Sequence, residues 1–146
     1  MDERDDQIIS ILQADGKATN RSIGEAINAS EETVRRRRDR LLLNGDMRIV
    51  CVPSPSMLGY GTQALIGVSV DLAMADAVAD QLSEIAEITW VAATTGAFDI
   101  FAWVVLQSTA ELRQLLAERV GTIDGVQRTE AFVSLENRKE RYGLKL

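Results

Sequence analysis

The residues with the most concentrated chemistry in this sequence are five arginines that fall within six consecutive positions. They are Arg35, Arg36, Arg37, Arg38 and Arg40. Guanidinium groups are permanently charged and bind phosphate oxygens through paired N–H donors. The whole chain has a formal net charge of −6, but phosphate binding depends on a local positive field, not on the total charge. The cluster therefore predicts contact with a nucleic acid.

The spacing of apolar residues places this cluster on the third of three short helices. Ile8 and Leu12 recur at helical spacing in a first helix, which should stop near Asp15-Gly16. A second helix is expected from about Asn20 to Ile27. Ser30 has the properties of an N-cap for the third helix, which contains the arginines and should end at Asn44-Gly45.

The junction between the second and third helices has the spacing of a helix-turn-helix. Gly24 is the small residue where the helices cross, Asn28 is the turn residue, and Val34 is the apolar anchor. The turn position usually requires a positive φ, which glycine adopts most easily and asparagine tolerates. A three-helix bundle without DNA binding would explain the apolar spacing equally well, but it would not explain the arginine cluster.

A helical wheel separates the side chains that face the core from those that face DNA. Val34 and Leu41 mark the buried side, and Arg37 and Arg38 fall near it, where a packing role is as good an explanation as DNA contact. The predicted DNA-binding residues are Ser30, Glu32, Thr33, Arg35, Arg36 and Arg40.

Within that set, we expect two kinds of contact. Glu32, Thr33 and Arg36 should lie near base edges, where a carboxylate can accept a hydrogen bond from cytosine. Arg35 and Arg40 should meet phosphates, which position a protein on DNA without reading its sequence.

The rest of the chain predicts a linker and a second domain. Met47 to Val52 is expected to form a short strand, as in the wing of a winged helix. The helix-turn-helix domain then covers residues 1–52, and residues 53–61, with two prolines, form a linker. Residues 62–146 contain a weak repeat with a shift of 38 positions, in which period-two spacing gives way to helical spacing. The repeat predicts a ferredoxin-like βαββαβ domain, so the fold class is α+β.

In such a domain, both helices cover one face of the sheet and leave the other face open. Trp90, Phe101 and Trp103 are candidates for buried or interfacial positions, without an assignment to either face. The last strand is expected from about Val126 to Leu135. The two middle strands should be joined at Thr95-Gly96-Ala97-Phe98-Asp99.

Composition argues against several classes of protein. The sequence has no histidine and one cysteine, Cys51, which excludes histidine-based catalysis, histidine metal sites and an internal disulfide. No stretch approaches the ~20 apolar residues of a membrane span, and residues 1–6 do not resemble a signal peptide. We therefore expect a cytoplasmic protein that does not contact membranes, and the lack of histidine argues against an enzyme.

Taken together and in order, several short motifs resemble the Lrp/AsnC family of feast/famine transcription factors. In the first half they are Asp5-Asp6-Gln7-Ile8-Ile9, Leu12 to Lys17, Ser30-x-x-Thr33-Val34-x-x-Arg37 and Leu41-x-x-x-Gly45-x-Met47. In the second half they are Leu58-Gly59, Thr95-Gly96-x-Phe98-Asp99 and Gly125-Val126. The recognition helix departs from the family pattern by opening with Glu31-Glu32.

The resemblance implies properties that spacing alone does not give. Members bind double-stranded DNA with the N-terminal domain, and their ferredoxin-like domain, called RAM, forms homodimers that often assemble into octamers. Small effectors, commonly amino acids, bind near the Thr-Gly-x-Phe-Asp turn, which here predicts an effector site at Thr95, Gly96, Phe98 and Asp99. Asp99 could then pair with an α-amino group. No metal or redox cofactor is expected.

Two alternatives remain open at this stage. Siroheme decarboxylases resemble the same family in both domains, although they are expected to use histidines that this chain lacks. An architectural DNA-compacting protein without effector sensing would have the same DNA-binding sequence features.

Overall fold

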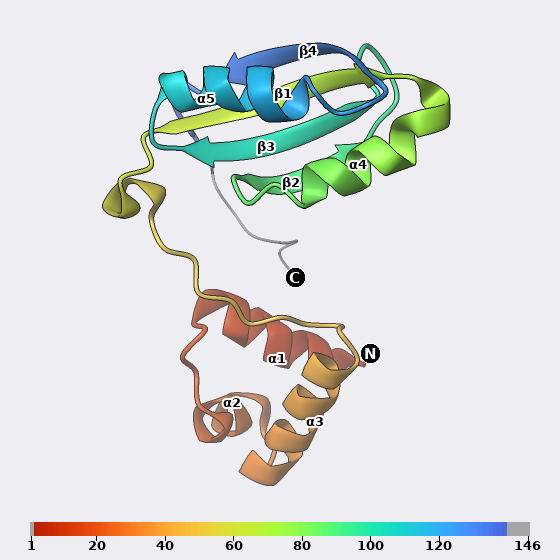
Figure 1. The fold of residues 1–146 in the computed structure, drawn as a ribbon. Helices are drawn as coiled ribbons and strands as arrows, with labels where there is room; N and C mark the ends of the chain where they lie inside the picture. Colours follow the sequence, from red (N-terminus) through yellow and green to blue (C-terminus); the bar gives the residue numbers. More distant parts are fainter. Residues whose placement is uncertain (1, 140–146) are drawn as a thin grey trace. The chain divides into compact units, whose positions relative to one another are not determined.

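The computed structural model describes residues 2–139, which form two compact units, residues 2–52 and residues 53–139 (Figure 1). Each unit has its own hydrophobic core. No helix within these residues is long and apolar enough to cross a membrane.

The first unit consists of three helices, α1 (Glu3–Ala14), α2 (Asn20–Ile27) and α3 (Glu31–Leu43). Each begins at a side chain that accepts a hydrogen bond from the first turn: Asp2, Thr19 and Ser30. The helices enclose a small core of fully or almost fully buried residues, which are Ile8, Leu12, Ile23 and Val34.

The α2–α3 turn has the geometry that the sequence predicts for a helix-turn-helix. Asn28 ends α2 in the left-handed region, with φ 53° and ψ 53°. A Cβ added to Gly24 would lie 2.6 Å from the carbonyl oxygen of Ala29, so only glycine allows this close approach. The chain can therefore turn sharply enough to start α3 at Ser30.

The strand predicted between Met47 and Val52 is not present. This segment pairs with no other strand within residues 2–139, and Ile49, Val50 and Val52 are exposed. An apolar run becomes a strand only where a neighbouring strand takes up its backbone hydrogen bonds, and the first unit offers none. Of the residues in this segment, only Met47 packs against the helical core. The expectation of a strand there was therefore wrong for the single chain.

The second unit has the predicted βαββαβ order. After a short 3₁₀ helix (Pro55–Leu58), the elements are β1 (Thr62–Val70), α4 (Ala75–Ser83), β2 (Ile88–Ala93), β3 (Ile100–Leu106), α5 (Thr109–Leu115) and β4 (Val126–Val133). The strands form one antiparallel sheet in the order β2-β3-β1-β4. β4 ends at Val133, two residues before the predicted end.

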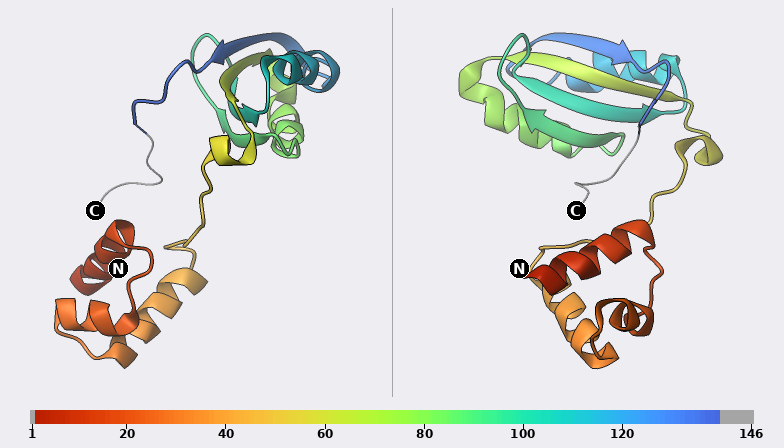
Figure 2. Two further views of the ribbon diagram at one scale, coloured as in Figure 1. Left: turned by 90° about the vertical axis from the view of Figure 1, so that its left-hand side faces the viewer. Right: turned by 180° about the vertical axis from the view of Figure 1, so that it is seen from behind.

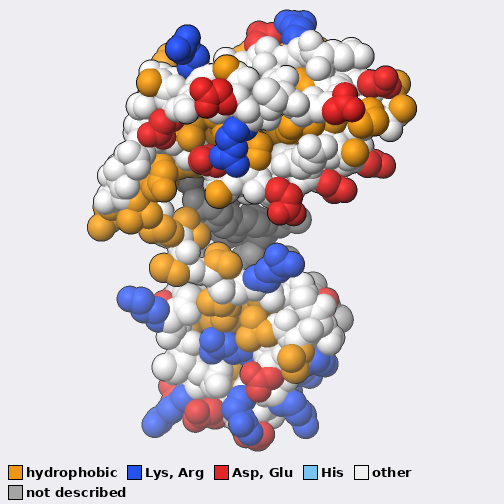
Figure 3. All heavy atoms as spheres, in the orientation of Figure 1, with side chains coloured by type: hydrophobic (Ala, Val, Ile, Leu, Met, Phe, Trp, Pro, Cys, Tyr) orange, Lys and Arg blue, Asp and Glu red, His pale blue; other side chains and the backbone are white. Residues whose placement is uncertain are grey.

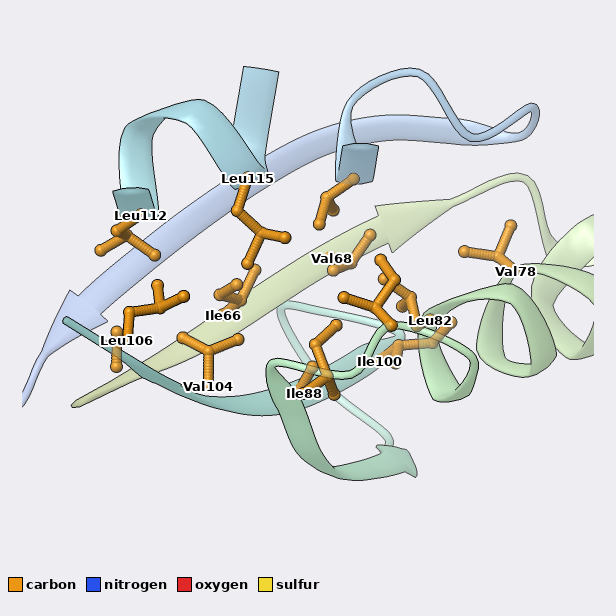
Figure 4. Packing of buried hydrophobic residues seen from close by; sticks show 14 of the residues in the cluster. Ile66, Val68, Val78, Leu82, Ile88, Ile100, Val104, Leu106, Leu112 and Leu115 are labelled. Atoms are coloured by element: carbon orange, nitrogen blue, oxygen red, sulfur yellow. The ribbon is translucent and has the colours of Figure 1, made fainter. Parts of the chain in front are cut away.

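Both helices lie on the same face of the sheet (Figures 1 and 2). Apart from Gly67, which is also buried, residues of β1 and β3 alternate between buried and half-buried, because successive side chains of a strand point to opposite faces. Ile66 and Val104 point toward the helices and meet Leu82 and Leu115 in a core of fully or nearly fully buried side chains (Figure 4). Within residues 2–139, the opposite face of the sheet carries no helix.

Candidate nucleic-acid interface and effector loop

The N-terminus of α3 presents the polar residues that the sequence assigned to DNA. The Ser30 hydroxyl accepts a hydrogen bond from the Thr33 backbone N–H at 3.2 Å and lies 2.8 Å from the Thr33 hydroxyl. Glu32 follows with 71% of its side chain exposed. Ser30 and Glu32 are exposed and Thr33 is partly exposed, so these three predicted residues share one accessible helix end.

The arginines of α3 divide into groups with different partners. Arg35 forms a paired interaction with Glu32 one turn earlier, with its Nη2 at 2.8 Å from Oε1 and 2.9 Å from Oε2. The hydrogen bond from Arg35, together with its charge, lowers the pKa of Glu32 below its usual value. Glu32 is therefore ionised at neutral pH and neutralises part of the Arg35 charge.

Arg37 and Arg40 instead contact the N-terminus of α1. Asp5, only 1% exposed, accepts a hydrogen bond from Arg37 Nη1 at 2.8 Å and from Arg40 Nη2 at 2.6 Å. Asp2 accepts two further hydrogen bonds from Arg37 Nη1, at 2.8 and 2.7 Å. Burial opposes ionisation of Asp5, but the hydrogen bond from Arg37, the Asp2 backbone N–H and the charge of Arg40 together lower its pKa. The hydrogen bond from Arg37 likewise lowers the pKa of Asp2.

Two arginines of the cluster remain. Arg38 donates a hydrogen bond from Nη1 to Asn20 Oδ1 of α2 at 3.3 Å. Arg36 is exposed and has no hydrogen bond or ion pair with any other residue in the described range 2–139. Arg36 lines a shallow hollow on the outer face of α3 together with Glu32 and Asp39. Figure 3 shows how basic and acidic side chains intermix at the end of the first unit formed by α2 and α3.

The structure thus refines the predicted interface. It places Ser30, Glu32, Thr33, Arg35 and Arg36 on one accessible side of α3, whereas Arg40 is half-exposed and shared with Asp5. The sequence reasoning missed Asp2 and Asp5 as partners of the arginines. Their separation of 32 to 35 residues from those arginines gives no local pattern, and an acidic first turn is already explained by the helix dipole.

The predicted effector residues lie at and beside the loop between β2 and β3. Thr95 and Gly96 are exposed at the tip. Gly96 has φ 129°, a conformation that side-chain-bearing residues rarely adopt. Thr94 closes the loop, because its hydroxyl donates to the Phe98 carbonyl at 2.8 Å and its backbone N–H donates to the Asp99 carbonyl at 2.8 Å.

Asp99 fastens this loop to β1. Its Oδ2 accepts a hydrogen bond from the Val70 backbone N–H at 2.9 Å, and its own backbone N–H donates to the Val68 carbonyl at 3.0 Å. One carboxylate oxygen is therefore engaged in structure. Oδ1 has no hydrogen bond within residues 2–139.

Phe98 covers a glycine on the sheet. Its ring is 7% exposed, and a Cβ added to Gly67 of β1 would lie 2.6 Å from the ring atoms Cγ and Cδ2. Arg128 of β4 lies over the same ring, with its guanidinium carbon 5.5 Å from the centroid. Phe101 and Phe132 meet the ring edge-on at 5.5 and 6.3 Å. Because Gly67 has no side chain, it leaves the space that the Phe98 ring of the predicted effector loop occupies.

The strand pairing assigns the aromatic residues that the sequence left unassigned. Trp90 pairs with Trp103, and Phe101 lies opposite Gly67. Since Ala102 and Val104 point into the core, Phe101 and Trp103 point to the face without helices. Trp90 is 51% exposed and Phe132 is 46% exposed on the same face. The helix-free face of the sheet is therefore aromatic and partly accessible.

The two units match two known domains in the same order. Residues 1–42 match the AsnC-type helix-turn-helix domain, and residues 63–144 match the Lrp/AsnC ligand binding domain. The chain belongs to the Lrp/AsnC family. An uncharacterized HTH-type transcriptional regulator of Pyrococcus furiosus is 34% identical to this Lrp/AsnC protein over 143 residues, which are 97% of each chain. The HTH-type transcriptional regulator FL11 of Pyrococcus horikoshii is 34% identical over 141 residues, or 96% of this chain and 93% of FL11.

Solved structures of the family have the same fold. The structure of AsnC from Escherichia coli has a TM-score of 0.91 and 26% identity, and it covers 100% of this chain and 99% of that chain. A transcriptional regulator of Neisseria meningitidis, solved as a complex with L-Met, has a TM-score of 0.90 and 24% identity, with 99% and 96% covered. This Lrp/AsnC protein is a transcriptional regulator with a DNA-binding helix-turn-helix domain and a ligand-binding domain.

Proposed function

We propose that the protein regulates transcription by reading a specific DNA sequence with the exposed side of α3. Base edges are contacted by Glu32, Thr33 and Arg36, while Ser30, Arg35 and the free part of the Arg40 guanidinium meet phosphates. The observation that carries this proposal is Arg36, an exposed arginine with no hydrogen bond or ion pair within residues 2–139, at the centre of the accessible face of α3.

We further propose that a small effector, an amino acid, binds at Thr95, Gly96, Phe98 and Asp99. The exposed backbone at Thr95 and Gly96 offers N–H groups to a carboxylate, and the free Oδ1 of Asp99 offers an acceptor to an α-amino group. The L-Met complex of the Neisseria relative supports an amino acid as the ligand class. Such a ligand changes DNA binding only if it binds two assembly states with different affinity.

The same proposal includes a homodimer in which a second copy covers the helix-free face of the sheet. Exposed aromatic side chains such as Trp90 and Phe132 are costly to leave in water when they form a contiguous patch. A two-fold dimer presents two α3 helices to successive major grooves. Dimers of this kind are proposed to assemble further, up to an octamer, and to act in the cytoplasm without catalysing a reaction.

The experiment is a titration of the full chain onto DNA from upstream of its own gene, at two salt concentrations, with and without pooled amino acids. Tight, salt-sensitive binding that scrambled DNA does not match supports the regulator, because phosphate contacts release counterions. A change in affinity with the pool supports the effector site, and splitting the pool identifies the ligand. Specific binding that no pool alters would remove the effector proposal and favour an architectural protein. Absence of binding to any DNA at low salt would contradict the regulator.

A further inference from the structure

Asp5 is the most deeply buried charged side chain in the described part of the molecule, and it lies in α1, outside the two helices α2 and α3 of the helix-turn-helix motif. Its side chain is 1% exposed, at the N-terminus of α1. A carboxylate in such a position is unstable unless it is fully paired. Both oxygens of Asp5 are paired with arginines of the recognition helix: Oδ1 with Arg37 and Oδ2 with Arg40.

The two arginines that bind Asp5 differ in exposure and in their number of partners. Arg37 has 19% of its side chain exposed and also binds Asp2, so its charge is paired with two carboxylates of the protein itself. Arg40 has 50% of its side chain exposed and meets Asp5 through Nη2 only. Asp5 therefore removes one arginine from the DNA-facing side and holds the other in a single orientation.

The contact also fixes the rotation of α3. Arg37 and Arg40 are one turn apart on the helix, so two hydrogen bonds to the same buried carboxylate leave α3 little freedom to turn about its axis. Because Arg36 immediately precedes Arg37 on the same helix, its direction relative to α1 is set by Asp5 as well.

We propose that Asp5 is a positioning residue for DNA specificity. It pairs with Arg37 and Arg40, so that Arg36 points outward and Arg40 meets DNA in one geometry instead of binding any phosphate within reach. This inference rests on the proposed DNA contact of α3. Without the Asp5 charge, Arg40 becomes a mobile cation. Mobile cations strengthen binding to every DNA sequence and contribute nothing to discrimination between sequences.

The test compares Asp5→Asn with the wild-type full chain on two duplexes, one selected from a random pool by the wild-type protein and a scrambled version of it. We expect Asp5→Asn to lower the ratio of the two affinities about tenfold, roughly the value of one well-placed base contact. The salt dependence on scrambled DNA should steepen by about 0.9 per recognition helix, because one more cation is free to release counterions. Glu3→Gln is the matched control, since it removes the same charge from the exposed first turn of α1, and it should change neither quantity.

A role limited to folding predicts a different result. Binding to both duplexes would then fall in parallel with the folded fraction measured by circular dichroism, and the salt slope would not change; this outcome would overturn the inference. If Asp5→Asn does not fold, Arg40→Lys gives the answer, because Asp5 keeps Arg37 and the charge of the helix is preserved. We expect Arg40→Lys to keep the salt slope and lose discrimination, and wild-type discrimination would overturn the inference. Failure of the wild-type chain to bind either duplex would instead remove the proposed function itself.

Discussion

Replacing Gly67 by alanine tests the account of the β2–β3 loop, because two opposing effects have to be weighed. The new Cβ would lie 2.6 Å from two ring atoms of Phe98 and 2.9 Å from a third. Relieving such an overlap in a packed region costs roughly 1–3 kcal/mol. Alanine also restricts the unfolded chain, which favours folding by about 0.4–1 kcal/mol where the backbone conformation suits it. The clash should win, so we expect Gly67→Ala to reduce the free energy of unfolding by about 0.5–2 kcal/mol.

Gly61→Ala is the matched control for this experiment. Its added Cβ meets only the carbonyl oxygen of Gln107, at an ordinary 3.5 Å. The entropic effect then acts alone, and the variant should be unchanged or stabilised by up to about 1 kcal/mol. Both variants are measured by urea denaturation with Trp90 and Trp103 as fluorescence probes. Equal stability of the two variants, or a stabilised Gly67→Ala, would refute the conclusion that Phe98 closes on Gly67.

Three further predictions concern stability. Asn28→Gly should raise the midpoint of thermal unfolding, and Asn28→Ala should lower stability by about 1 kcal/mol, because φ is 53° at this position; a lower midpoint for the glycine variant would contradict this. Leu82→Ala should cost about 2–5 kcal/mol in urea denaturation, since the side chain is 0% exposed between sheet and helix, and a loss below 1 kcal/mol would contradict the packing. The pKa values of Asp2 and Asp5 are lowered in the folded state. The stability that these two ionised carboxylates give to the fold is therefore present above their unfolded pKa of about 4, and it is lost as the pH falls through the folded pKa. Thermal unfolding of Asp5→Asn should therefore depend less on pH between about 5 and 2 than that of the wild type, and parallel curves would count against the ion pairs.

The parts of the fold that were predictable are those set by local spacing. Gly24, Asn28 and Ser30 act within one turn of the chain, so their residue types are enough to indicate the sharp turn and the start of α3. The alternation in β1 and β3 and the helical spacing in α4 and α5 were likewise enough to predict the βαββαβ order.

The parts that were not predictable depend on contacts between distant segments. Met47 to Val52 has the composition of a strand, but a strand also needs a neighbour, which no local pattern reveals. The pairing of Asp5 with Arg37 and Arg40 spans more than 30 residues. Gly67 could not be distinguished from an ordinary strand glycine until Phe98 was seen to fold over it. The residues proposed to bind DNA and the effector stay predictions.

The most direct test of the central claim is the selection of DNA from a random pool by the wild-type chain, followed by binding measurements with Arg36→Gln and Arg21→Gln. Arg21 is an exposed arginine of α2 paired with Glu25, so this variant removes a charge from the same domain away from the proposed reading face. We predict that the selection yields a defined motif, that Arg36→Gln loses about 1–3 kcal/mol of discrimination for it, and that Arg21→Gln keeps it. A pool without any enriched motif, or equal discrimination by the two variants, would contradict the claim that α3 reads DNA through Arg36.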